Sequence, residues 1–189
     1  MENKKIWNSL ERAKFIMSVI TALISLFLTI GLFYYGNKYE KTKWTNQTLT
    51  TKKLELYESM MPKFNAILCY MNDYGTFKEH SPKEIIDFKR SLNLTYYTNR
   101  DFFSPDFKKE YLNFIDNLCF ENYSGKWDSQ IKKDFSYSKA GYEKMNHENP
   151  WDNSWNEMFT NETVNKKEIE NSYYRLMNLF IDDMGFIKE

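Results

Sequence analysis

The longest apolar stretch of the chain runs from Phe15 to Tyr35 and contains no charged residue. At about 1.5 Å of rise per residue, a helix of this length spans roughly 32 Å, close to the thickness of the hydrocarbon core of a bilayer. Lys14 and Lys38 bracket the stretch, as basic side chains do at membrane interfaces. A secretory signal peptide fits poorly, because the apolar core is too long and no small-residue cleavage site follows it. The pattern therefore predicts a transmembrane helix.

One face of this predicted helix carries small and hydroxyl side chains, within an arc of about 100° when successive residues are 100° apart. We refer to it as the small-residue stripe; its members are Ser18, Thr21, Ala22, Ser25 and Thr29. Small side chains let membrane helices approach closely, and hydroxyl groups form hydrogen bonds across the contact. We therefore expect a homo-oligomer that forms through the stripe. The alternative is that the hydroxyl groups bond only the backbone of their own helix.

The polarity of the remaining chain predicts a membrane-anchored soluble domain. We expect a short tail over residues 1–14, the transmembrane helix over 15–35, a juxtamembrane stalk over 36–53 and a soluble helical domain over 54–189. The segment Glu40–Lys53 has little apolar face, so it is either a solvated helix or a flexible tether. The soluble part is rich in Phe, Tyr and Trp, which argues for one packed core and against disorder.

Apolar positions in the soluble part recur at helical spacing. A first set predicts a helix with one packed face: Leu54, Tyr57, Met61, Phe64, Leu68 and Met71. A second set predicts the last helix: Ile169, Tyr173, Leu176, Met177, Phe180 and Met184. We expect Tyr173, Leu176 and Phe180 to be buried against the first set and against a helix over Phe107–Leu118. Pro62 should kink the first helix or begin a new one, because proline removes a backbone donor and clashes with the preceding turn.

Local signals complete the predicted fold. Ser81-Pro82 and Ser104-Pro105 each predict a helix start, since a Ser N-cap precedes a proline at the first helical position. Short helical patterns appear over Asp128–Phe135 and Trp151–Phe159, and no segment shows the alternation of a strand. The sequence thus predicts an all-α protein, with one transmembrane helix followed by a compact bundle of four to six helices.

Composition and charge limit the function classes. The formal net charge is +0, which argues against a nucleic-acid partner held by phosphate contacts. Cys69 and Cys119 lie in apolar helical surroundings, so we expect buried free thiols and no disulfide. Basic residues are nearly balanced on the two sides of the apolar stretch. We expect a location in the inner (plasma) membrane, with the C-terminal domain in the cytoplasm.

A second candidate site mixes basic and aromatic residues in the least regular part of the chain. Its members are Lys126, Trp127, Lys132, Lys133, Tyr137 and Lys139. Such a mixture can stack a base and hold a phosphate, so we consider a ligand or nucleotide patch here. A solvated surface whose aromatic rings pack on the core explains the same residues. His80 and His147 are far apart and no nucleophile–base arrangement is evident, so we expect no metal, no cofactor and no catalytic residue.

Several segments carry a resemblance: LELYESMMPKFN, SPKEIIDFKR, FFSPDF and YYRLMNLF. Over roughly residues 54–185 the chain resembles a family of small bacterial single-pass membrane-anchored helical proteins with no established activity. The shared segments are helix starts and core aromatics, so the resemblance implies a common fold and carries no catalytic residue across.

These observations favour a non-enzymatic, membrane-anchored protein that contacts membrane lipid and responds to a protein partner or a small signal. In a bacterium, such a protein fits a phage-defence effector that acts by oligomerising in the membrane. Two alternatives stay open. One is a passive tethering subunit that recruits a soluble enzyme, and the other is a membrane-bound enzyme with an unrecognised site.

Overall fold

The computed structural model describes residues 9–162 and 164–185. The predicted all-α class is confirmed, because one long apolar N-terminal helix is followed by a helical domain with little strand. The chain divides into two compact units, the first reaching Thr50 and the second beginning at Thr51. Each unit is described by itself.

Helix α1 runs from Ser9 to Asn72. The described residues of the first unit are the N-terminal part of this helix. An 18-residue window of this helix has a mean hydropathy of 2.4, and none of the window is buried. By length and composition, it is the one described helix that is apolar enough to cross a bilayer. The predicted stalk over 36–53 is helical, and so are residues 9–14 of the predicted tail. The rest of that tail lies outside the described residues.

The second unit begins with the last part of α1, whose buried face differs from the predicted one. Leu54 is 44% exposed, whereas Leu56 and Met60 are buried. Together with Phe64 and Leu68, the two missed residues form a row of every fourth position along one side of the helix. The predicted face is therefore right at its C-terminal end and wrong at its start.

Helix α1 continues through Pro62, so the alternative in which this proline begins a new helix is wrong. A proline inside a helix costs about 3 kcal/mol. Met60 and Phe64, on either side of it, are almost fully buried. Burying large apolar side chains in a core stabilises by a comparable amount for each side chain, which offsets the cost of the proline.

Both predicted Ser-Pro helix starts are confirmed. Ser81 caps helix α2 (Pro82–Thr98) in a capping box, in which its backbone N–H donates to Glu84 Oε2 at 2.7 Å. Ser104 caps helix α3 (Pro105–Leu112) by accepting a hydrogen bond from the backbone N–H of Phe107 at 3.1 Å. These caps satisfy N–H groups that have no partner within the helix.

The remaining elements of the second unit are mostly short helices. They are the 3₁₀ helices η1 (Gly75–Glu79), η2 (Arg100–Phe102) and η4 (Asn153–Met158), the π-helical turn η3 (Asn113–Cys119), and the α-helices α4 (Phe135–Met145) and α5 (Lys166–Met184). The predicted last helix is confirmed as α5. The predicted short helix around Trp151–Phe159 corresponds to η4.

A small antiparallel hairpin corrects two expectations. Strand β1 (Phe120–Asn122) pairs with β2 (Ser129–Ile131), and Phe120 lies opposite Ile131. The expectation that no strand forms is wrong, as is the helical pattern expected over Asp128–Phe135. Three-residue strands are too short to show alternation, and burial of the Phe120 and Ile131 side chains holds the hairpin on the core.

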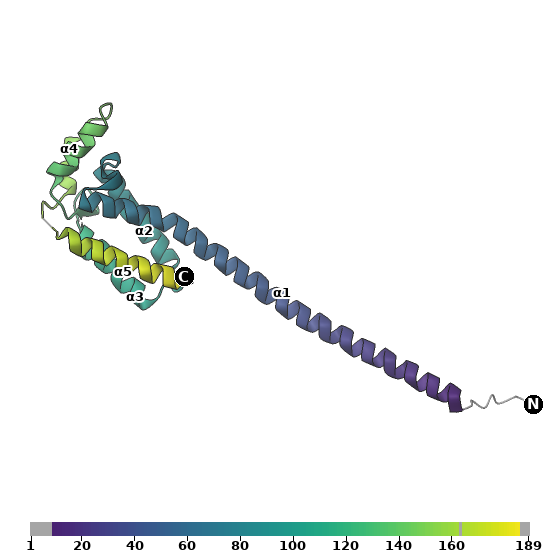
Figure 1. Ribbon diagram of the computed structural model, residues 1–189. Helices are drawn as coiled ribbons and strands as arrows, with labels where there is room; N and C mark the ends of the chain where they lie inside the picture. Colours follow the sequence, from purple (N-terminus) through teal and green to yellow (C-terminus); the bar gives the residue numbers. More distant parts are fainter. Residues whose placement is uncertain (1–8, 163, 186–189) are drawn as a thin grey trace, which may run out of the picture. The chain divides into compact units, whose positions relative to one another are not determined.

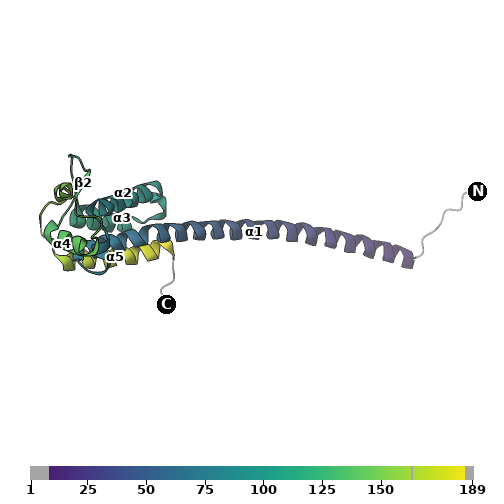
Figure 2. The ribbon, with the colours of Figure 1, turned by 90° about the horizontal axis from the view of Figure 1, so that it is seen from above.

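Aromatic rings dominate the core of the second unit. Helices α5 and α3 lie side by side (Figures 1 and 2), and Phe180 of α5 is fully buried among rings from neighbouring segments. Its ring centroid lies 5.5 Å from that of Phe107, 5.6 Å from Tyr57 and 6.2 Å from Phe64. The predicted burial of Tyr173, Leu176 and Phe180 is confirmed.

Cys69 and Cys119 are buried free thiols, as the sequence predicts. Burial raises the pKa of the Cys119 thiol, because a thiolate loses its hydration there. Both side chains therefore act as small apolar groups in the core.

Replacement of Phe180 by alanine should lower the free energy of unfolding by about 3–5 kcal/mol, because it removes a ring from a closed aromatic cluster. The measurement is denaturant unfolding of the full chain. Tyr174→Ala, on the same helix at a side chain that is 54% exposed, is the matched control and should change stability by less than about 0.5 kcal/mol. Equal midpoints for Phe180→Ala and wild type would contradict this placement.

Candidate functional site

The basic and aromatic residues of the predicted ligand patch do not converge on one site. Lys126 Nζ lies 5.1 Å from the ring centroid of its neighbour Trp127. Lys139 Nζ lies 4.0 Å from Glu143 Oε1, one turn along α4. These three predicted members do not line the pocket described next, so the six residues do not all line one pocket.

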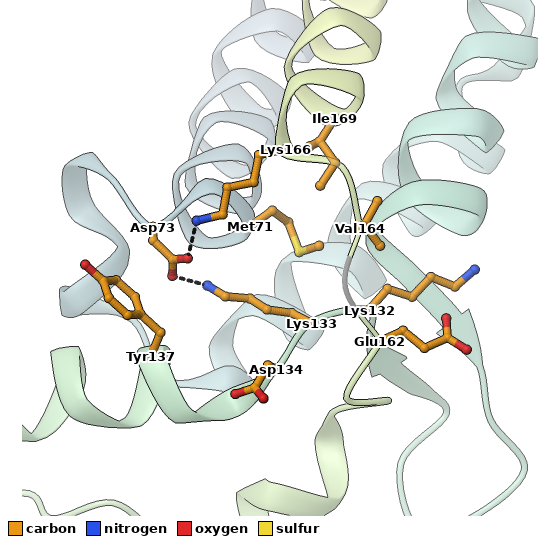
Figure 3. A pocket seen from close by; sticks show the side chains of 10 residues that line it. All are labelled: Met71, Asp73, Lys132, Lys133, Asp134, Tyr137, Glu162, Val164, Lys166 and Ile169. Atoms are coloured by element: carbon orange, nitrogen blue, oxygen red, sulfur yellow. Dashed lines mark hydrogen bonds and ion pairs between the residues drawn. The ribbon is translucent and has the colours of Figure 1, made fainter.

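The other three members line a pocket of about 170 Å³ in the second unit. It lies where α1 ends and where α4 and α5 begin (Figure 3). Its lining residues are Met71, Asp73, Lys132, Lys133, Asp134, Tyr137, Glu162, Val164, Lys166 and Ile169.

Asp73 is the polar centre of this pocket. One carboxylate oxygen accepts a hydrogen bond from Lys133, and the other accepts one from Lys166 at 2.7 Å (Figure 3). Asp73 directly follows α1 and has a φ of 60°, in the left-handed region. Asp and Asn adopt this conformation more readily than most residues other than glycine. The left-handed conformation therefore ends α1 at the residue whose carboxylate binds two lysines.

The two lysines that bind Asp73 differ in their surroundings. The Lys133 side chain is 9% exposed, whereas that of Lys166 is 57% exposed. Lys133 also donates a hydrogen bond to the carbonyl oxygen of Tyr70, and its Nζ lies 4.9 Å from the Tyr70 ring centroid. Burial lowers the pKa of Lys133, and the hydrogen bond with Asp73 opposes that shift. Lys133 is thus a buried cation whose partners lie within the protein.

The apolar side chains that line the pocket lie together (Figure 3). Met71, Val164 and Ile169 lie beside one another opposite Tyr137, whereas Lys132 and Glu162 point away from the Asp73 carboxylate (Figure 3). Lys132 Nζ instead donates to the carbonyl oxygen of Asn117 at 3.1 Å. The pocket therefore offers an apolar wall next to one paired carboxylate.

Sequence reasoning missed Asp73 and Lys166. The contact partners of Asp73 lie 60 and 93 residues further along the chain, so no local spacing connects them. Two local signals were present in the sequence. Asp73 directly precedes Tyr74-Gly75, where the helix ends, and Lys166 lies at the start of the last helix.

A second buried lysine has a structural task. Lys89 Nζ, on α2, donates to Ser129 Oγ at 2.7 Å and to Asn122 Oδ1 at 3.1 Å, on the two strands of the hairpin. Asp128 accepts hydrogen bonds from the Arg90 guanidinium at 2.8–3.1 Å. These contacts attach the hairpin to α2.

In the first unit, each hydroxyl of the small-residue stripe is bonded within its own helix. The Ser18 hydroxyl donates to the carbonyl of Phe15 at 2.8 Å, and those of Thr21, Ser25 and Thr29 donate to the carbonyls four residues earlier at 2.8–2.9 Å. Ala22 has no polar group to place. The stripe therefore needs no second helix to satisfy its donors, and its small size is what it offers to another helix.

Within the described residues, no group of three or more His, Cys, Asp or Glu side chains is placed to hold a metal ion. Comparison of the chain with protein-family models, with curated proteins and with solved structures finds no match.

Replacement of Asp73 by asparagine should lower the free energy of unfolding by about 3–5 kcal/mol, because it leaves the buried Lys133 ammonium without its counter-charge. The Asp73→Asn, Lys133→Met double variant should recover most of that loss, since it removes the stranded charge as well. Lys166→Met is the control and should cost less than about 1 kcal/mol, because that lysine is largely exposed. Denaturant unfolding of the four proteins checks the expectation, and additive losses in the double variant would contradict it.

Proposed function

We propose that this chain is a non-enzymatic, single-pass membrane protein whose helical domain responds to a partner protein or a small signal. The observation that carries the proposal is the contrast between its two units. No part of the apolar window of α1 is buried in the protein. The buried core residues, of which Leu56 is the first and Met184 the last, form a separate hydrophobic cluster in the second unit.

The exposed apolar surface of the first unit requires an apolar environment. Phe27, Leu32 and Phe33 are each more than 70% exposed, and soluble monomers rarely leave such continuous apolar surface in water. A bilayer matches the length of the stretch and covers all sides of the helix at once. This fit supports contact of the first unit with membrane lipid.

We further propose that the second unit lies in the cytoplasm, at the inner (plasma) membrane. The two free thiols suit a reducing compartment. A reporter that is active only in the cytoplasm, fused to the C-terminus, tests the orientation. Activity of a periplasm-dependent reporter at the same position would reverse it.

Self-association through the small-residue stripe is the proposed route by which binding in the second unit is transmitted. In a bacterial cell, this arrangement fits a defence effector that perturbs the membrane when it oligomerises. The pocket at Asp73 favours a domain that binds a small signal over a passive tether, because a tether needs no pocket with an apolar wall and an exposed ion pair.

Two lysines placed within the apolar stretch, at Ile24 and Leu28, should release the protein from membranes. Each charged residue at the centre of a membrane helix costs about 2.5–3.5 kcal/mol of insertion free energy. The measurement is the fraction that remains in the membrane pellet after alkaline extraction. Lysines at Thr45 and Thr48, in the polar part of α1, are the matched control and should leave membrane retention unchanged. Extraction of the wild type by alkali would refute the membrane proposal.

Bulky leucines at Ala22 and Ser25 should prevent self-association of the full chain, because packing of membrane helices depends on close backbone approach. The matched control places Ile at Leu23 and Leu at Phe27, outside the stripe. Crosslinking in membranes measures the outcome. We expect crosslinked oligomers for the wild type and the control and monomers for the stripe variant; equal yields from both variants would remove the stripe from the contact.

A further inference from the structure

We propose that the pocket at Asp73 binds the ammonium group of a small primary amine with an apolar body, and that the Lys166 side chain occupies this ammonium position when no amine is bound. The inference names the ligand class of the signal-responsive domain and rests on the proposed function for its biological role. The binding itself is tested independently of the membrane.

The ammonium position is already visible in the contacts of Lys166. Its Nζ lies 2.7 Å from Asp73 Oδ2 and 5.9 Å from the ring centroid of Tyr137. A carboxylate together with an aromatic face is the combination that proteins use to recognise ammonium groups. The Asp73 side chain is only 8% exposed, so the carboxylate is held in place before any ligand arrives.

Lys166 is the replaceable one of the two lysines. Its side chain is 57% exposed and starts at the first residue of α5, so it can turn into solvent without disturbing the core. The exchange of one ammonium for another keeps an ammonium–carboxylate pair at Asp73, and the Lys166 ammonium is free to be hydrated by water, so the exchange costs little. Lys133 remains in place, because it is buried and also bonds the Tyr70 carbonyl, and it fixes the carboxylate that the ligand needs.

The charges around the pocket favour a cation over an anion. When Lys166 turns outward, Asp73 and Asp134 carry two negative charges against the single positive charge of Lys133. Lys132 and Glu162 carry opposite charges, and both point away from the carboxylate (Figure 3). An anion that approached Lys166 would have to displace Asp73, which Lys133 also holds. An amine restores the balance of charge that Lys166 now provides.

The volume and the apolar wall set the size of the amine. A pocket of about 170 Å³ is similar to a cavity of about 150 Å³ that accepts benzene. Met71, Val164 and Ile169 offer an apolar surface beside the ammonium position. A body of about six carbon atoms therefore fits, and benzylamine is a suitable probe.

The test measures the thermal unfolding midpoint of the full chain in detergent micelles near pH 7, with increasing benzylamine. A ligand that binds only the folded state raises the midpoint as its concentration exceeds Kd. We expect a Kd on the order of 1 mM, which suits so small a ligand. Benzyl alcohol and benzoate are the matched neutral and anionic probes, and neither should raise the midpoint.

Lys166→Met removes the internal competitor and should lower the Kd for benzylamine about fivefold, given the small contribution of an exposed ion pair. Tyr137→Leu removes the aromatic face and should weaken binding severalfold. The midpoint of each variant without ligand checks that it folds, and Lys166→Gln serves as the second variant if Lys166→Met is unstable.

Three results would overturn the proposal. No response to benzylamine in wild type or in the Lys166 variants would exclude an amine site. An equal response to benzyl alcohol would show an apolar cavity without ammonium recognition, and a response to benzoate that Lys166→Met abolishes would show an anion site. Membrane retention of the same protein after alkaline extraction tests the proposed membrane anchoring separately from amine binding.

Discussion

The packing of Phe64 is the interaction on which the second unit depends. This side chain belongs to α1 and is fully buried. Its ring centroid lies 6.0 Å from that of Tyr111, 6.3 Å from that of Phe114 and 6.2 Å from that of Phe180. It therefore joins the end of α1 to the α3–η3 segment and to α5. Because edge-to-face rings fit in few arrangements, the contact fixes the rotation of α1 about its axis as well as its position.

That rotation decides which groups the last residues of α1 meet. Nine residues after Phe64, the chain turns into the left-handed region at Asp73, and Lys133 donates to the carbonyl of Tyr70, one of the carbonyls that a helix end leaves unpaired. Lys133 thus caps α1 and neutralises Asp73 at once, which explains how a lysine can be buried there. Only the second oxygen of the carboxylate remains for the exposed Lys166, so the polar chemistry of the pocket follows from how α1 is terminated.

The sequence was informative wherever a signal is local. The Ser81 and Ser104 caps and the apolar face of α5 are set by residues within one or two turns, and all are confirmed. Contacts between distant residues left no such signal. The β1–β2 hairpin depends on Lys89 and Arg90 of α2, more than thirty residues away, and Asp73 meets its lysines only after the whole unit has folded. The start of the buried face of α1 was misplaced for the same reason, since the core that buries Leu56 and Met60 is built from segments far along the chain.

The position of the pocket limits what a bound amine can do. A ligand shifts a conformational equilibrium only by the difference in its affinity for the two states. Exchange of one ammonium for another at Asp73 leaves the charge at the end of α1 unchanged, so the helix terminus itself gains or loses little. What changes is the first turn of α5, where the Lys166 side chain loses its link to Asp73. Any coupling must therefore act through the difference between a first turn of α5 that is linked to Asp73 and one that is released. Because an ion pair with an exposed lysine contributes less than about 1 kcal/mol, the conformational equilibrium shifts by no more than about fivefold. A response of that size is graded, and only assembly of several chains would sharpen it.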